Sequence, residues 1–162
     1  MSRAAGALLL LGVAGCSGGS GASAGPEDVR VIVGPQDVNV RPSQYCLNGK
    51  RQRFDITPPI LEVSPGAPVA LTVPDSVARH GWSVQVFDEK LEQPLGDVDV
   101  PKGKAVFEEI NTSDVVPPAF YLVVVEHKGG DCGEWSGAWP VGFLRAGGDV
   151  SGAPSSSSAA TG

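Results

Sequence analysis

The stretch FYLVVVEH, residues 120–127, decides the fold. It is rich in aromatic and β-branched residues, which favour strands over helices. It is also apolar on both faces of an extended chain, so neither face is suited to water. We therefore expect residues 120–127 to form a central strand of a sheet.

Short apolar runs on either side of this stretch are separated by Pro and Gly. In PGAPVALTVP, the alternating residues Val69, Leu71 and Val73 fall on one face of a strand. Trp82, Val84 and Val86 do the same in WSVQVFD. VRVIVG, FDITP, KAVFEEI and AWPVGFLRA complete the series, although KAVFEEI shows no clear apolar face. No window of about eleven residues carries a helical stripe, so strands are expected throughout.

Strands at intervals of roughly ten residues indicate an antiparallel sandwich. The chain is therefore predicted to be all-β, an immunoglobulin-like or cupredoxin-like antiparallel β-sandwich with one disulfide. Asn48-Gly49 favours a tight hairpin turn just before FDITP. Pro140 cannot donate to a sheet ladder, which suggests an edge strand or a bulge there.

Length and charge limit the class of protein. The 162 residues suffice for one domain of ordinary size. The formal net charge is −6, which gives little attraction to phosphate backbones. We therefore expect no nucleic-acid partner.

The N-terminal residues read as an export signal. Arg3 supplies a positive charge, and residues 4–14 are apolar or small, a stretch too short to span a bilayer. Val13-Ala14-Gly15-Cys16 resembles the lipobox of bacterial lipoproteins, in which the cysteine thiol takes a diacylglyceryl group and becomes the new N-terminus. The expected partner is then a membrane, through a lipid anchor on Cys16, at the extracytoplasmic face of the cell membrane. A plain secretory signal with a chance cysteine is the alternative.

The composition divides the chain into four segments. Residues 1–15 form the signal peptide, and residues 16–28 combine the lipidated cysteine with a flexible Gly/Ser tether. Residues 29–146 form the sandwich domain. Residues 147–162 form a disordered tail of Ser, Ala and Gly.

Lipidation of Cys16 leaves two cysteines, Cys46 and Cys132, which are expected to pair in an oxidising compartment. The competing possibility is a metal site that uses both thiolates with His80 or His127. No C-x-x-C spacing is present, which argues against zinc.

One candidate binding patch lies on two loops. The segment EHKGGDCGEWSGAW carries aromatic and basic side chains, which are favoured at binding surfaces. The patch would combine Arg79, His80, His127, Lys128, Trp135 and Trp139 if both loops lie at the same end of the domain. Alternatively, the tryptophans cover the disulfide and the edge of the sandwich.

The segment DSVARHGWSVQVFD resembles the first-histidine strand of copper-binding cupredoxins. Such copper sites use two histidines, a thiolate and often an axial methionine. Here His127 precedes Cys132, no histidine follows it, and the only methionine is Met1. We therefore predict no metal and no cofactor, and we keep extracytoplasmic copper binding as the alternative function.

No motif of the chain indicates catalysis. Ser136 lies one place too late for a G-x-S-x-G nucleophile elbow, and no nucleophile–base set can be assembled. The acidic pairs Asp97/Asp99, Glu108/Glu109 and Asp131/Glu134 read as solvated faces, as does the basic hairpin around Lys50. The chain is therefore predicted not to be an enzyme.

Several motifs together resemble a known family. The lipobox, QYCLNG, HGWSV, YLVVVEH and DCGEWSGAWPVGFLRA are similar to a family of actinobacterial lipoproteins catalogued as domain of unknown function 2771. The resemblance implies a cell-envelope location and no activity, and it carries over no catalytic residues. The expected function is a membrane-anchored binding or scaffolding module whose partner, a protein or a small ligand, is unknown.

Overall fold

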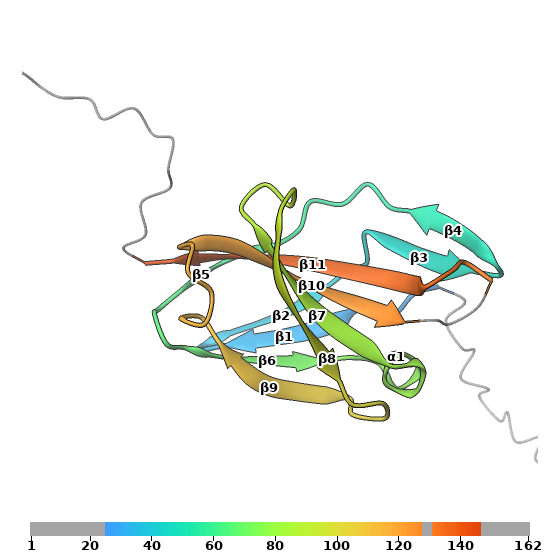
Figure 1. Cartoon of the computed structure of the whole chain (residues 1–162), viewed down its shortest axis with the longest axis horizontal. Helices are drawn as coiled ribbons and strands as arrows, with labels where there is room; N and C mark the ends of the chain where they lie inside the picture. The colour runs from blue at the N-terminus through green and yellow to red at the C-terminus, as the bar shows by residue number, and fades with distance from the viewer. Residues whose placement is uncertain (1–24, 128–130, 147–162) are drawn as a thin grey trace, which may run out of the picture.

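Two facing sheets form the molecule (Figure 1). The computed structural model describes residues 25–127 and 131–146. The smaller sheet has the strand order β2-β1-β6-β9, and the larger has the order β4-β3-β11-β10-β7-β8. The strands are β1 (Val29–Val33), β2 (Gln36–Val40), β3 (Gln44–Leu47), β4 (Lys50–Arg53), β5 (Ile60–Val63), β6 (Pro68–Thr72), β7 (Trp82–Asp88), β8 (Pro94–Val100), β9 (Val106–Asn111), β10 (Ala119–His127) and β11 (Trp135–Arg145). Apart from the parallel pair of β5 and β11, the strand pairs of these ranges are antiparallel, which confirms the predicted all-β sandwich.

The smaller sheet follows its period-two pattern closely. Val69, Leu71 and Val73 are buried, as predicted, and they face the core with the alternate valines of β1. Full burial of a side chain of this size stabilises the fold by roughly 1.5–3 kcal/mol. The hydrophobic alternation therefore fixes the register, because a slip by one residue would turn these side chains toward water.

β10 lies between β11 and β7, which confirms that residues 120–127 form a central strand. Phe120, Leu122 and Val124 point into the core between the sheets. Phe120 stacks on Phe143 of β11 with their ring centroids 5.2 Å apart. The intervening residues Val123 and Val125 belong to a second, smaller apolar cluster, so they occupy the opposite face of the larger sheet.

The ambiguous segment KAVFEEI is resolved by an irregularity in the ladder. Phe107 and Ile110 are both buried, although they are three positions apart, and Glu108 and Glu109 between them are exposed. The β6–β9 register shifts at this point. A β-bulge places an extra residue on one strand, so the two apolar side chains reach the same core.

Pro140 lies neither on an edge strand nor at a bulge, and this expectation is wrong. β11 is an internal strand that has β10 on one side and two short partners, β3 and β5, on the other. β3 pairs with β11 up to Ala138, and β5 begins to pair at Gly142. Pro140 falls in the gap between these partners, where a missing N–H leaves no ladder bond unmade.

Two local expectations have different outcomes. Asn48 and Gly49 both have positive φ, as a tight hairpin turn between β3 and β4 requires. FDITP forms no strand, because residues 54–59 cross from β4 to β5 without ladder pairing and end in Pro58-Pro59. The short helix α1 (Asp75–His80) was not predicted, because its six residues are fewer than a window of helical periodicity needs.

Some predicted features lie outside the described residues. These are the signal peptide, Cys16, most of the tether, Lys128 and the C-terminal tail. Within residues 25–127 and 131–146, no helix has the length and apolar character needed to cross a bilayer.

Candidate functional site

Trp139 does not belong to the predicted patch, because it is a core residue with 1% exposure. Its indole Nε1 donates a hydrogen bond to the carbonyl oxygen of Glu27, at 3.0 Å. A bulge in β11 places Trp139 and Trp135 on different faces. His127 pairs with Trp135 and Glu126 pairs with Gly137, so Ser136 has no partner in the register. The bulge reverses the alternation, and Trp135 and Trp139 therefore lie on opposite faces of β11.

His80 lies at the end of α1 and contacts a buried carboxylate. Its Nδ1 is 2.6 Å from Oε1 of Glu126, a β10 residue with 1% side-chain exposure. Oε2 of Glu126 has no hydrogen-bond partner among the described residues. The charge of Glu126 also affects Tyr45 of β3: burial raises the pKa of the Tyr45 hydroxyl, and the charges of Glu126 and Glu27 raise it further. The His80–Glu126 contact links α1 to the larger sheet.

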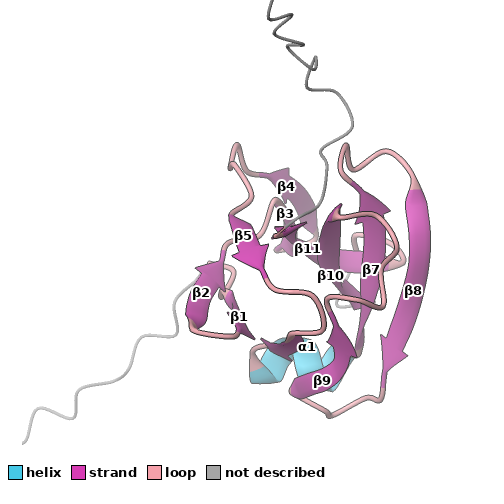
Figure 2. Ribbon diagram, turned by 90° about the vertical axis from the view of Figure 1, so that its left-hand side faces the viewer, coloured by secondary structure: helices cyan, strands magenta, loops and turns pink. Residues whose placement is uncertain are grey.

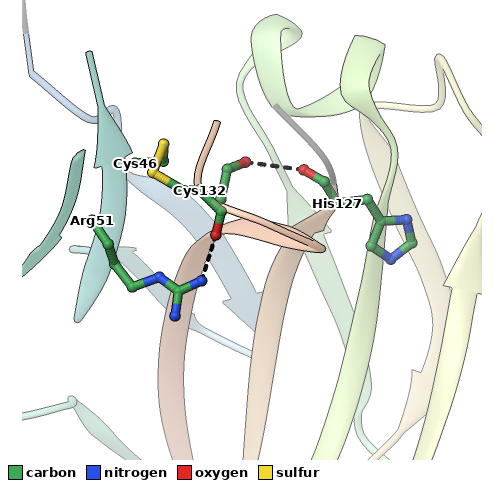
Figure 3. Close-up of a disulfide and its surroundings, with 5 residues drawn as sticks. Cys46, Arg51, His127 and Cys132 are labelled. Carbon is green, nitrogen blue, oxygen red and sulfur yellow. Dashed lines mark hydrogen bonds between the residues drawn. A yellow bond between two sulfur atoms is a disulfide. The ribbon is translucent and has the colours of Figure 1, made fainter. Parts of the chain in front are cut away.

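His127 follows this pair but faces away from it. Its backbone N–H donates to the carbonyl of Gly81, and its Nε2 is 3.8 Å from Oδ1 of Asp99 on β8. Arg79 is exposed on α1. Figure 3 shows the His127 imidazole pointing away from the disulfide. The patch residues that the structure describes are therefore divided between the α1 end, the core and the region of the disulfide.

The disulfide joins Cys46 of β3 to Cys132 in the loop before β11, as predicted (Figure 3). Arg51 of β4 donates a 2.5 Å hydrogen bond from Nη2 to the carbonyl oxygen of Cys132. The Arg51 guanidinium also lies over the ring of Trp135, 4.5 Å from its centroid. A cation–π contact of this kind fixes the indole at the rim of the larger sheet.

An apolar groove lies on the outer face of the larger sheet. We call it the outer-face groove, and its volume is about 520 Å³. Its floor comes from β7, β10 and β11, and one wall comes from the segment 54–59 that follows β4. The lining residues are Ser43, Gln44, Ile56, Pro58, Gln85, Phe87, Leu91, Val123, Val125, Trp135, Ala138 and Pro140. None of these side chains is ionisable, and a volume of this size is typical of small-molecule sites.

Most of the groove was missed from the sequence. Trp135 was predicted as a binding residue, but Phe87, Val123, Val125 and Ala138 were not. The available signal was the second apolar face of residues 120–127, which was read only as a mark of a central strand. In a two-layer sandwich a central strand has one face in the core, so the other apolar face requires a separate explanation.

The remaining candidates have structural roles. Ser136 is buried, and its hydroxyl donates to the carbonyl of His127 at 2.9 Å. The acidic pairs read as solvated faces are exposed, and so are all four residues of β4. The sulfur atoms of Cys46 and Cys132 are bonded to each other in the disulfide. The described ranges contain no group of three or more His, Cys, Asp or Glu side chains that could hold a metal ion.

Comparison with known proteins identifies a family without an assigned activity. A family model described as "Protein of unknown function (DUF2771)" matches residues 24–128, which is more than half of the chain. The match ends before Cys132 and before β11. No curated protein and no solved structure matches the chain. This protein therefore belongs to the DUF2771 family.

Proposed function

We propose that this chain is a lipid-anchored protein of the cell envelope whose sandwich binds an acyl chain of a membrane lipid in the outer-face groove, without catalysis. The support for the anchor is the sequence around Cys16, where a charged start, a short apolar run and a lipobox-like Val13-Ala14-Gly15 come together. Two acyl chains on one cysteine hold a protein stably at a bilayer, whereas a single chain gives only reversible binding.

The observation that carries the binding proposal is the composition of the groove. Its floor is apolar, and its polar side-chain groups are neutral: those of Ser43, Gln44 and Gln85 and the indole N–H of Trp135. The hydroxyl of Ser43 already donates to the carbonyl of Ala138. An uncharged apolar ligand therefore leaves no buried charge unpaired in this groove.

Backbone pairing distinguishes an acyl chain from an apolar peptide. The floor strands β7, β10 and β11 are internal, so their main-chain groups are used within the sheet. A peptide laid on this face would bury amide groups without backbone partners, which is unfavourable. An acyl chain has no such groups, and each buried methylene contributes about 0.8 kcal/mol.

The absence of catalysis is proposed on the position of Ser136. This hydroxyl is the closest approach of the sequence to a nucleophile motif, and it donates to a backbone carbonyl inside the larger sheet. A general base would have to be within hydrogen-bond reach of a serine nucleophile. Hydrolysis of ester substrates that is lost in Ser136→Ala would contradict this part of the proposal.

The anchor is tested by expressing the full chain in a bacterial host and partitioning it between detergent and water. We expect the protein in the detergent phase and the Cys16→Ser variant in the aqueous phase. Ser17→Ala, a change at the adjacent residue, serves as the matched control and should remain in the detergent phase. Equal partitioning of the Cys16→Ser variant and the parent chain would refute the anchor.

The groove is tested with the full-length Cys16→Ser chain, so that the anchor does not interfere. The probe is the neutral dye N-phenyl-1-naphthylamine, displaced by dodecyl maltoside below its critical micelle concentration. Ala138→Phe should fill the groove and weaken dye binding by about tenfold or more, equivalent to 1.4 kcal/mol. If an extended apolar peptide displaced the dye better than dodecyl maltoside, the proposal of an acyl-chain ligand would be refuted in favour of a peptide.

A milder pair of variants protects this test against misfolding. Val125→Thr keeps the side-chain shape in the groove floor and adds a hydroxyl, and we expect it to weaken dye binding several-fold. Val106→Thr makes the same change at an exposed position of the smaller sheet and should leave binding unchanged. Equal effects of the two changes would show that the dye does not occupy the outer-face groove.

A further inference from the structure

β8 forms one margin of the larger sheet (Figure 2). In the described part of the chain it pairs only with β7, so its other edge is open. Alternate residues of an edge strand direct their N–H and C=O groups away from the sheet. The first six of its seven residues are exposed, which leaves these groups accessible to another chain.

The two faces of β8 differ in chemistry. Val98 and Val100 are opposite Val84 and Trp82 of β7, which are buried between the sheets. Asp97 and Asp99 alternate with these valines and therefore point to the other face of the larger sheet. A strand added beside β8 would continue this alternation, with one face toward the apolar interior and the other beside two carboxylates.

An apolar groove of about 450 Å³ adjoins the open edge. Its apolar lining residues are Val86, Leu95, Val98, Ile110, Val115, Val116 and Pro117. Leu95 is 42% exposed, and Val116 is 89% exposed. Alternate apolar side chains of an added strand would cover these surfaces and remove them from water.

The charges around this groove are mainly negative. Glu109 and Asp114 line it together with Asp97, whose side chain, like that of Asp99, lies on the other face of β8. The Lys104 ammonium is engaged at 2.8 Å by Glu109, and the Asp114 carboxylate accepts hydrogen bonds from Asn111. Asp97 forms no ion pair within the described ranges. Basic side chains are therefore the complement of this edge.

The same charges disfavour a second copy of the chain as the partner. Two β8 strands placed edge to edge would bring the carboxylates of Asp97 and Asp99 close to those of the other copy. Like charges on adjacent strands are destabilising, and acidic edges are a common protection against such pairing.

From these observations we propose that β8 is a docking edge for an extended segment of another protein in which apolar and basic side chains alternate. The segment pairs its backbone with β8, inserts its apolar side chains beside Val98, and places its Lys or Arg side chains beside Asp97 and Asp99. This mode of recognition takes affinity from main-chain hydrogen bonds and specificity from alternate side chains.

The test uses the full-length Cys16→Ser chain and a fluorescent, end-capped peptide of alternating valine and lysine, followed by anisotropy. We expect saturable binding and slower hydrogen exchange at the outward-facing amides of β8. A peptide of the same length with glutamate in place of lysine should bind at least about tenfold more weakly, a difference of 1.4 kcal/mol. N-methylation of alternate peptide amides should abolish binding while leaving the side chains unchanged.

Charge reversal on the protein provides the matched comparison. The double variant Asp97→Lys, Asp99→Lys should lose binding of the lysine peptide. Asp55→Lys, Glu62→Lys changes the net charge equally at exposed acids outside β8 and should retain it. The proposal is overturned if no peptide binds at millimolar concentration, if N-methylation has no effect, if both double variants behave alike, or if the chain dimerises through β8.

Discussion

Replacing Cys46 and Cys132 with alanine removes the covalent link between β3 and the loop before β11. The bond is formed across a sequence separation of 86 residues. In the chain-entropy model, opening a loop of this length lowers the free energy of unfolding by about 4–5 kcal/mol. That loss is a large fraction of the 5–15 kcal/mol that is typical of a domain, so we expect a measurable and severe destabilisation.

The assay is urea unfolding followed by tryptophan fluorescence. With an m-value of about 1–2 kcal/mol/M, the midpoint of the double variant should fall by roughly 2–5 M. A reducing agent should lower the midpoint of the parent chain to that of the variant and leave the variant unchanged. A midpoint within about 0.5 M of the parent would refute the entropic argument, because it corresponds to less than about 1 kcal/mol.

The same variant shows which part of the fold depends on the bond. β3 pairs with β11 at only two positions, Gly137 with Tyr45 and Ala138 with Gln44. Without the disulfide, amides of the β3–β4 hairpin should therefore exchange earlier than those of β10. Uniform exchange across both regions would show that the hairpin is held by its other contacts.

Three further predictions concern individual residues. Gly137→Ala should lower the free energy of unfolding by about 1–3 kcal/mol in urea melts, because the new Cβ would be 2.4 Å from an indole carbon of Trp139. Gly96→Ala is the control: nothing lies within 4 Å of its new Cβ, so this change should be neutral or slightly stabilising. His80→Ala removes the hydrogen-bond partner of the buried Glu126 carboxylate and should lower the free energy of unfolding by about 1–3 kcal/mol. Adding Glu126→Gln should recover part of this loss, and equal stability of the single and double variants would contradict the pairing. Backbone N–H groups hold the pKa of Asp88 below its ordinary value. The contribution of Asp88 to stability is therefore complete above the unfolded pKa of about 3.9 and is lost as the pH falls through the folded pKa. A carboxyl-carbon NMR titration with a midpoint at or above about 3.9 would contradict this prediction.

The predictable parts of the fold are those in which a regular period meets a core. In β6 and β7 the period of two predicted the core face: Val69, Leu71, Trp82 and Val84 are buried, and Val86 packs half-buried against the same core. β9 and the start of β11 contain irregularities that displace the alternation by one residue. A bulge is determined by pairing with a distant strand, so the local sequence of β11 could not show that Trp135 and Trp139 would separate.

The candidate site was predictable only in its covalent part. The pairing of Cys46 with Cys132 was predicted from the number of cysteines and from the expected export of the chain, and the structure contains this disulfide. The outer-face groove depends on three strands and on residues 54–59, which are not a strand. Pairing between strands that are distant in the sequence, which composition does not encode, brings Phe87 of β7 into one apolar cluster with Val123 and Ala138.

The most direct test of the proposed function is methyl NMR of the full-length Cys16→Ser chain during titration with dodecyl maltoside below its critical micelle concentration. The account predicts saturable shifts at the methyl groups of Val123, Val125 and Ala138, with nuclear Overhauser contacts to the dodecyl chain of the probe. The methyl groups of Val106 should remain unperturbed. Shifts confined to residues outside the outer-face groove, or none at all, would contradict the claim that this face of the sheet binds lipid.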